Sequence, residues 1–334
     1  MEDSKANREF FRCPHRPRSA FTLIELLVSF AVFSLLMALV FSVIGQTSSI
    51  LRHSTNDLNS FQSARQAFDI LTRSVGQATL GSYWDYQFTS GQADRYRRNS
   101  DLNFIVGPAG VNGLPGTPGC GQAIFFQALL GKIGVGQTPT GAQQLLNEIG
   151  FYVEFGSNLA NLPTALSPRL KEKYRYRLFQ SIKPTSELDI YKTAAGRTWV
   201  NDDNAQPIAD NVIALVLVPR RASAEEVRLG PLVTDIAYDS RLNAENYPQP
   251  VTAHQLPPFC ETFLVAIDED SATRLANGAT PPTAIAQALS GKFQTLSQLE
   301  DDLEGLISEL QNAGVAARIF SIRLPMRESK WSEF

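Results

Sequence analysis

Residues 19–44 carry the sequence SAFTLIELLVSFAVFSLLMALVFSVI. One acidic residue, Glu25, lies near the start of this apolar run, and residues 26–44 contain neither a charge nor a proline. A helix needs about 20 apolar residues to span a bilayer, so the run predicts one membrane-spanning helix. A carboxylate inside hydrocarbon is unfavourable by about 2.5–3.5 kcal/mol on insertion scales, so Glu25 is expected to have a partner and a function.

Residues 1–20 are basic, with five Lys or Arg against three Asp or Glu. Basic residues beside an apolar helix favour the cytoplasmic side, which predicts that residue 45 and those after it lie outside. A secretory signal peptide would carry a cleavage site of the Ala-x-Ala kind after its apolar core. The chain continues instead with GQTSS at 45–49, so cleavage behind the helix is not expected.

A small residue, Ala20, precedes Phe-Thr-Leu-Ile-Glu at 21–25, between a basic leader and an apolar helix. This arrangement resembles the cleavage and methylation signature of type IV prepilins and type II secretion pseudopilins. The resemblance implies that a membrane peptidase cuts between Ala20 and Phe21 and methylates the new amine of Phe21. It also implies that Glu25 pairs with the amino terminus of a neighbouring subunit, which offsets the burial of its charge. The family usually has Gly where this chain has Ala20, and a plain single-pass anchor is the alternative interpretation.

The helix is expected to continue beyond the membrane, because no proline interrupts residues 20–80. One helix of about 55 residues, about 85 Å long, is compatible with this stretch. Large apolar residues recur in it at steps of three, four and seven, with polar residues between them: Leu51, Leu58, Phe61, Phe68, Leu71 and Val75. This spacing predicts an amphipathic helix over 45–80 that docks on a globular head, and a helical linker is the alternative.

After residue 80, short apolar runs punctuated by Gly, Pro and Asn replace the helical periodicity. We expect strands at 103–106, 123–129, 149–155, 174–180, 212–218, 262–267 and 317–324. Helices are expected at 282–289 and 295–313, with long insertions at 156–168 and 221–258. The chain is therefore predicted to be α+β, with a long N-terminal helix followed by a mainly antiparallel β-sheet head with large loop insertions. The predicted divisions are a leader at 1–20, a membrane helix at 21–44, a docking helix at 45–80 and a head at 81–334.

Glycines recur every third residue over 107–119, with prolines between them. About five triplets are too few to sustain a collagen helix, so an exposed mobile loop is expected.

The composition limits the function classes. Removing the leader's five bases and three acids from 30 and 33 leaves 25 and 30, a formal charge of −5, so a nucleic-acid binder is not expected. Cys13 would leave with the leader, and Cys120 and Cys260 would remain. An even pair in an exported protein permits a disulfide, and two unpaired buried thiols are the alternative.

The sequence contains no zinc-ligand spacing, no Gly-x-Ser-x-Gly elbow and no phosphate-binding loop. We therefore expect neither a catalytic site, nor a cofactor, nor a metal. Acidic clusters at 268–270 and 300–302 lack the alternate-oxygen spacing of a calcium loop. A solvated turn and a helix N-terminus are the better interpretations of these clusters.

Three parts of the head extend the resemblance. Residues 210–218 and 256–269 resemble the first core strand and the following Leu-Pro and strand of the minor pseudopilin J of type II secretion. Residues 319–331 resemble the C-terminus of the Verru_Chthon cassette protein C family, whose members are large J-like relatives.

Together these features predict a non-enzymatic minor pilin or pseudopilin. It would be processed by a prepilin peptidase and methyltransferase, held in the inner membrane with its head in the periplasm, and assembled with other pilin-like subunits into a periplasmic or cell-surface filament. The large head is more compatible with a tip position than with a repeating shaft. The alternative is a single-pass membrane-anchored periplasmic binding or catalytic protein that uses the prepilin signal for export.

Overall fold

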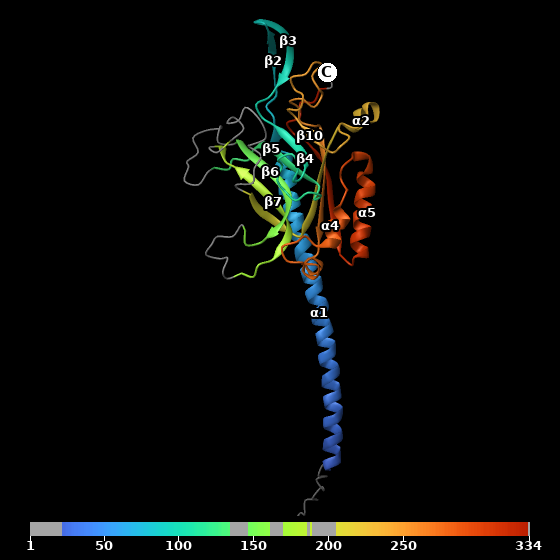
Figure 1. Ribbon diagram of the computed structural model, residues 1–334. Helices are drawn as coiled ribbons and strands as arrows, with labels where there is room; N and C mark the ends of the chain where they lie inside the picture. The colour runs from blue at the N-terminus through green and yellow to red at the C-terminus, as the bar shows by residue number, and fades with distance from the viewer. Residues whose placement is uncertain (1–21, 134–145, 161–169, 186–187, 189–204, 333–334) are drawn as a thin grey trace, which may run out of the picture. The chain divides into compact units, whose positions relative to one another are not determined.

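The computed structural model describes residues 22–133, 146–160, 170–185, 188 and 205–332 (Figure 1). The chain divides into two compact units, Met1–His53 and Ser54–Phe334. Helix α1, Leu23–Val75, is 53 residues long and contributes to both units. The predicted N-terminal helix is therefore confirmed, and its bounds lie within the proline-free stretch from which it was predicted.

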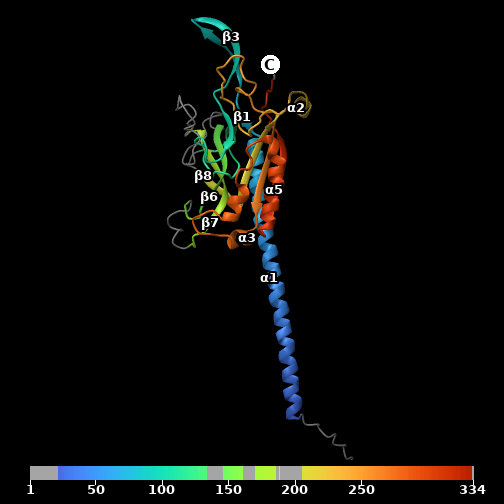
Figure 2. The same ribbon diagram turned by 45° about the vertical axis from the view of Figure 1, so that its right-hand side comes forward.

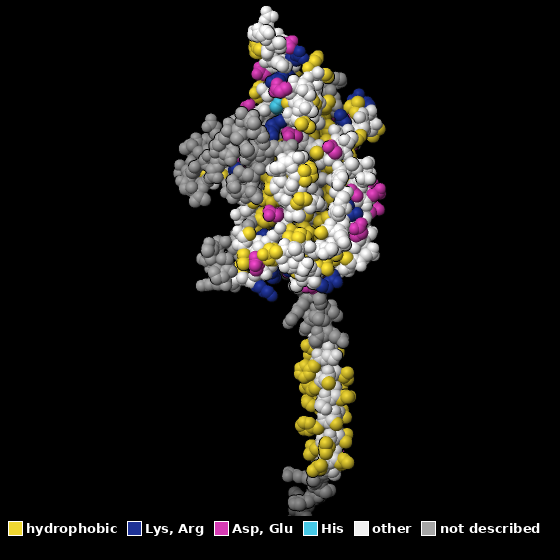
Figure 3. All heavy atoms as spheres, viewed as in Figure 1, with side chains coloured by type: hydrophobic (Ala, Val, Ile, Leu, Met, Phe, Trp, Pro, Cys, Tyr) yellow, Lys and Arg dark blue, Asp and Glu magenta, His cyan; other side chains and the backbone are white. Residues whose placement is uncertain are grey.

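In the first unit, every side chain of residues 22–44 is exposed. Figure 3 shows apolar side chains along the visible side of this segment. Residues Leu23–Ile44 form a 22-residue span whose mean hydropathy of 2.7 and length suit a membrane crossing. A helix that is apolar on all sides and uncovered by its own chain needs lipid or other helices around it.

The second unit contains a seven-stranded antiparallel sheet in the order β10-β4-β5-β6-β7-β8, with β1 paired to β5 (Figures 1 and 2). Each strand of this sheet is antiparallel to its neighbours, as the alternation of apolar runs and turn residues predicts. Its strands are β1 (Ala78–Thr79), β4 (Phe104–Pro108), β5 (Gln122–Leu129), β6 (Leu146–Ser157), β7 (Tyr174–Lys183), β8 (Ala205–Asp210) and β10 (Tyr238–Asp239).

A second antiparallel sheet has the order β12-β11-β9, made of β9 (Val212–Arg220), β11 (Phe259–Ile267) and β12 (Ala317–Pro325). Every residue of β9 except Arg220 is buried. This explains why its sequence is a continuous apolar run rather than an alternating one. A bridge between Gly121 and Leu215 joins the chain leading into β5 to the middle of β9.

The core of the second unit lies between these sheets and several helices. The part of α1 within this unit contributes Ala64, Ala67, Phe68, Leu71 and Val75 to it, and the Phe68 ring lies 6.0 Å from that of Phe320 in β12. Helix α5 (Leu299–Asn312) buries one stripe at steps of four, three and four: Leu299, Leu303, Leu306 and Leu310. The remaining helices are α2 (Ser223–Leu229), α3 (Glu269–Arg274), α4 (Thr283–Leu289) and the 3-10 turn η4 (Leu296–Gln298).

The predicted α+β class, the seven expected strands and both expected helices are confirmed. The expectation of an exposed loop over 107–119 is wrong in part. Ala109 and Leu114 are buried, and the amide of Thr117 donates to the carbonyl of Val153 in β6 at 2.9 Å. An added Cβ on Gly116, whose φ is +111°, would lie 2.9 Å from that same carbonyl oxygen. This glycine therefore permits close packing against the sheet.

The sequence did not predict the hairpin of β2 (Tyr83–Thr89) and β3 (Gln92–Asn99), which forms a separate two-stranded sheet. Its strands are rich in Tyr, Arg and Gln and bury little, so they lack the apolar run by which the other strands were found.

Candidate functional site: the N-terminal helix cap and a cavity beside α1

The first described residues form a reciprocal cap at the start of α1. The Thr22 amide and hydroxyl both donate to Glu25 Oε2 at 3.0 Å. The Glu25 amide donates in return to the Thr22 hydroxyl at 3.4 Å. This is the capping box, in which residues three apart satisfy amides that the first turn of a helix leaves free. Thr-x-x-Glu is its sequence signature, so the signal was present in the sequence and sequence analysis overlooked it.

Glu25 is exposed, and among the described residues no cation pairs with it. Within residues 22–133 and the other described ranges, its charge is met by the cap and by the N-terminal end of the helix dipole. The predicted cleavage and methylation residues, Ala20 and Phe21, lie outside the described residues. Within the described residues, the capping box holds the Glu25 carboxylate against Thr22 at the start of α1.

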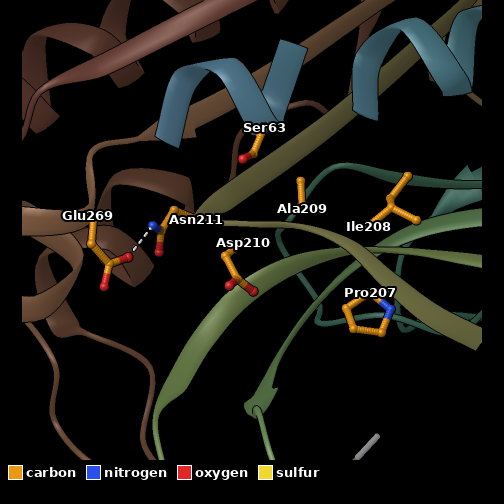
Figure 4. Close-up of a pocket in the computed structure, with 7 residues that line it drawn as sticks. All are labelled: Ser63, Pro207, Ile208, Ala209, Asp210, Asn211 and Glu269. Carbon is orange, nitrogen blue, oxygen red and sulfur yellow. Dashed lines mark hydrogen bonds between the residues drawn. The ribbon is translucent and has the colours of Figure 1, made fainter. Parts of the chain in front are cut away.

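The second unit contains a cavity of about 400 Å³ lined by α1, β8 and α3. Figure 4 shows Ser63 on the helix side, Pro207–Asp210 along the strand, and Asn211 directed at Glu269. Asn211 Nδ2 donates to Glu269 Oε2 at 2.7 Å, and Arg175 Nη2 donates to Glu269 Oε1 at 3.2 Å. The carboxylate of Glu269 thus accepts hydrogen bonds from Asn211, which follows β8, and from Arg175 in the adjacent strand β7.

The two carboxyl groups of this cavity have opposite pKa shifts. Burial by the surrounding protein raises the pKa of Asp210, although its side chain stays open to solvent on the cavity side, and the charge of Arg177 opposes this effect. For Glu269, burial alone would raise the pKa, but the hydrogen bond from Asn211 and the charge of Arg175 outweigh it. The pKa of Glu269 is therefore lowered.

Asn211 is a structural corner between the two sheets. It has a φ of +61°, a conformation that Asn tolerates better than most residues. Its amide donates to the carbonyl of Tyr176 in β7, and its carbonyl accepts from Ile267 in β11. The polar groups around Asn211 form hydrogen bonds with one another where the chain passes from β8 to β9. We interpret this cluster as holding the fold together.

Both acidic clusters lie at helix starts, so the interpretation of 268–270 as a solvated turn is wrong and that of 300–302 as a helix N-terminus is confirmed. Asp268 accepts a hydrogen bond from the amide of Ser271 at 2.9 Å and caps α3. Residues 300–302 form the first turn of α5, as expected for negative charge at a helix N-terminus. Among the described residues, no group of three His, Cys, Asp and Glu side chains could hold a metal ion.

The sequence permitted either a disulfide or two unpaired thiols, and the structure has the unpaired thiols. Cys120 and Cys260 are both buried and unpaired, and burial raises the pKa of each to about 12. The carbonyl of Cys120 accepts from Leu215, whereas Cys260 pairs with Pro219, four residues further along β9. Four strand residues span about 13 Å, and a disulfide needs Cα atoms within about 7 Å. The fold therefore keeps the two thiols apart.

Comparison with known proteins identifies one feature of the chain. Residues 15–41 match the prokaryotic N-terminal methylation motif. No curated protein and no solved structure matches the chain. The matched segment covers the basic leader's end, the capped Glu25 and most of the exposed apolar helix. The chain therefore carries a pilin-like or pseudopilin-like export signal at its N-terminus.

Proposed function

We propose that this protein is a non-enzymatic structural subunit of a pilus-like or type II secretion-like assembly. The observation that carries the proposal is the methylation motif on a helix whose apolar side chains its own chain leaves uncovered. Within the described residues, 22–44 are exposed on all sides. Lipid covers them after insertion, and the helices of other subunits cover them after assembly.

Cleavage between Ala20 and Phe21 creates a positive charge that can pair with the Glu25 carboxylate of a neighbouring subunit. It removes the basic leader and leaves a positively charged amine on Phe21, directly before Thr22. In the membrane an unpaired carboxylate is costly, so pairing Glu25 with an amine of a neighbouring subunit favours assembly at one axial position. The capping box keeps the Glu25 side chain at the helix start, where a neighbour's amine can reach it.

The finer assignment rests on sequence resemblance. The segments at 210–218, 256–269 and 319–331 favour a minor pseudopilin of the J type, close to the Verru_Chthon cassette protein C family. Its partners would be a prepilin peptidase and sibling pilin-like subunits, with the helix in the inner membrane and the head in the periplasm. The size of the head favours a tip or priming position, because bulky heads obstruct repeated packing.

The test is the mass of the N-terminal peptide of protein purified from its own cells. We expect a peptide that begins at methylated Phe21. An Ala20→Gly variant, which restores the family's usual residue, should be cut at the same bond. An intact Met1, or cleavage beyond Ile44, would defeat the proposal. A mature protein that starts at Phe21 but never co-purifies with another pilin-like chain would favour the membrane-anchored alternative.

A further inference from the structure

The hairpin of β2 and β3 projects from the second unit (Figures 1 and 2). In the part of the chain that the structure describes, its strands pair only with each other, from Tyr83↔Asn99 to Thr89↔Gln92, with a register shift between Gln87 and Phe88. Successive side chains of a strand point to opposite faces, so Trp84, Tyr86 and Phe88 share one face. Tyr96 pairs with Tyr86 and lies on the same face. We call these four residues the aromatic face.

The aromatic face is exposed. The exposed fractions are 50% for Trp84, 55% for Tyr86, 64% for Phe88 and 56% for Tyr96. The rings of Trp84 and Tyr96 lie nearly parallel with centroids 6.0 Å apart, and Tyr86 meets Tyr96 edge-on at 4.5 Å. Three of the rings therefore support one another and present a joined surface.

The opposite, polar face of the hairpin lies against its own chain. Arg95 sits 4.1 Å from the centre of the Tyr247 ring, and Arg97 is paired with Glu245. An antiparallel ribbon usually turns its apolar face to the protein and its polar face to water. Beyond its base, this hairpin does the reverse. At the base, Arg98 pairs with Trp84 and shares its face, is buried, and lies 5.8 Å from the centre of the Trp84 ring. Burial within this chain therefore does not account for the four aromatic residues.

The base of the hairpin is fixed to the head. Arg98 is 6% exposed, and its guanidinium donates to the carbonyls of Pro250, Val251 and Ala253. The Gln249 side chain accepts from the Arg98 amide and donates to the Arg98 carbonyl. These bonds hold the hairpin's orientation, so the aromatic face is presented in a set direction.

The size of the aromatic face restricts its partner. A large aromatic side chain offers about 150–250 Å², so four that are roughly half exposed offer about 400–500 Å². This is the size of a functional patch on a monomer, roughly 300–600 Å². It is well below the roughly 800 Å² that each partner of a stable protein complex buries. A narrow ligand therefore fits the face better than a second protein or a second copy of this chain.

The charges around the aromatic face restrict the partner further. Asp94 is paired with Arg95 at 2.7 Å, and Arg97 with Glu245, so the hairpin offers no uncompensated cluster of either sign. The tip, Thr89-Ser90-Gly91-Gln92, is polar and is followed by Asp94 within two residues. A hairpin that inserts into lipid would carry its apolar residues at the tip. These features favour a neutral, hydroxylated ligand.

We propose that the aromatic face binds a chain of neutral polysaccharide. The C–H groups on one side of a sugar ring carry partial positive charge, and the nearly parallel faces of Trp84 and Tyr96 carry partial negative charge. Tyr86, which is edge-on to Tyr96, borders these two faces. The sugar rings stack along the hairpin, while their hydroxyls reach the phenol and indole groups at the ring edges. A polymer only one sugar wide covers the patch without needing a wider interface.

The test uses the full chain in detergent micelles. Its migration is followed in native gels containing hydroxyethylcellulose, xyloglucan, galactomannan or mixed-linkage β-glucan, and its retention on cellulose and chitin is measured. Alginate gels and flotation with phosphatidylglycerol–phosphatidylethanolamine vesicles test an anionic polymer and a membrane. We expect at least one neutral polysaccharide to slow or retain the protein, and alginate and vesicles not to.

Alanine variants test whether the aromatic face is the binding surface. Trp84→Ala and Tyr86→Ala should each weaken binding about fivefold to tenfold, as loss of one aromatic contact predicts. Tyr83→Ala is the matched control, because Tyr83 lies on the polar face and is 41% exposed. Phe88→Ala removes the most exposed ring of the four and should weaken binding without changing the melting temperature.

The proposal is overturned if no neutral polysaccharide retards the wild-type protein. Binding to alginate or vesicles alone would overturn it in favour of an anionic polymer or a membrane. Equal weakening by Tyr83→Ala and Trp84→Ala at unchanged melting temperatures would also overturn it, because the aromatic face would then not be the binding surface.

Discussion

The two parts of α1 differ in what covers their apolar side chains. In the first unit, residues 22–44 are exposed throughout. In the second unit, Ala64, Ala67, Leu71 and Val75 are at most 1% exposed, while Arg65, Asp69 and Arg73 between them are exposed. One helix thus has an amphipathic part, which its own head covers, and a part that is apolar on all sides.

The difference shows which contacts come from within the chain. A one-sided stripe fits a single packing surface, and the sheets of the head supply that surface through residues such as Phe320. A single packing surface cannot cover all the side chains of a helix that is apolar on every side. The first part therefore depends on its surroundings, and substitutions in the two parts should affect different properties.

The largest effect is expected from Glu25→Gln. Glutamine keeps the capping-box hydrogen bonds but loses the charge, so insertion and cleavage should be retained while co-assembly with sibling subunits falls at least tenfold. Pull-down of the mature protein with its partners measures this. Glu25→Ala should behave in the same way.

Thr22→Val is the converse change, because it removes the cap hydroxyl and keeps the charge. It should destabilise the first turn of α1 by about 1 kcal/mol and leave co-assembly largely intact. If Thr22→Val abolished assembly while Glu25→Gln did not, the carboxylate would act through the cap and not through its charge.

The second prediction separates the covered part of the helix from the uncovered part. Leu71→Ala should lower the free energy of unfolding of the head by about 2–5 kcal/mol, since Leu71 is fully buried. Leu35→Ala is the matched control, because Leu35 is 65% exposed. Thermal melting of the head in detergent should show a lower midpoint for Leu71→Ala alone. Equal losses in both variants would mean that the head also covers the first part.

The smallest effect concerns the cavity beside Ser63, at the covered part of the helix. The pKa of Glu269 is lowered in the folded state, so its ionised form stabilises the fold above its unfolded pKa, and this contribution is lost as pH falls through the folded value. Glu269→Gln should therefore be less stable than the wild type at neutral pH.

The difference between wild type and Glu269→Gln should shrink in acid. Asp210→Asn should have the opposite sign, because the raised pKa of Asp210 makes its ionised form unfavourable in the folded state. Thermal unfolding across a pH series measures both variants. A Glu269→Gln deficit that grew as the pH fell would contradict the assignment.

Much of the fold follows from local patterns. The uninterrupted apolar run after Glu25 and the stripe through Phe68 and Leu71 predict α1, and the run at 212–218 predicts a strand that proves to be buried. Hydrophobic periodicity carries this information because it reports burial directly.

What the sequence did not show depends on contacts between distant residues. The hairpin at 83–99 is held at its base by Arg98, whose partners lie about 150 residues away. The packed glycine loop depends on Val153, and the separation of the thiols depends on the register of β9 against β11. Short-range spacing contains none of these pairings. The Thr22–Glu25 cap is local and could have been predicted.

In the proposed assembly, the helices of other subunits cover residues 22–44. A photoreactive phenylalanine analogue at Phe33, which is 56% exposed, tests this in cells, with the same analogue at the buried Phe68 as control. We predict adducts between position 33 and pilin-like chains, reduced by Glu25→Gln, and none from position 68. Adducts only with lipid at position 33, in cells where the assembly is complete, would contradict the claim.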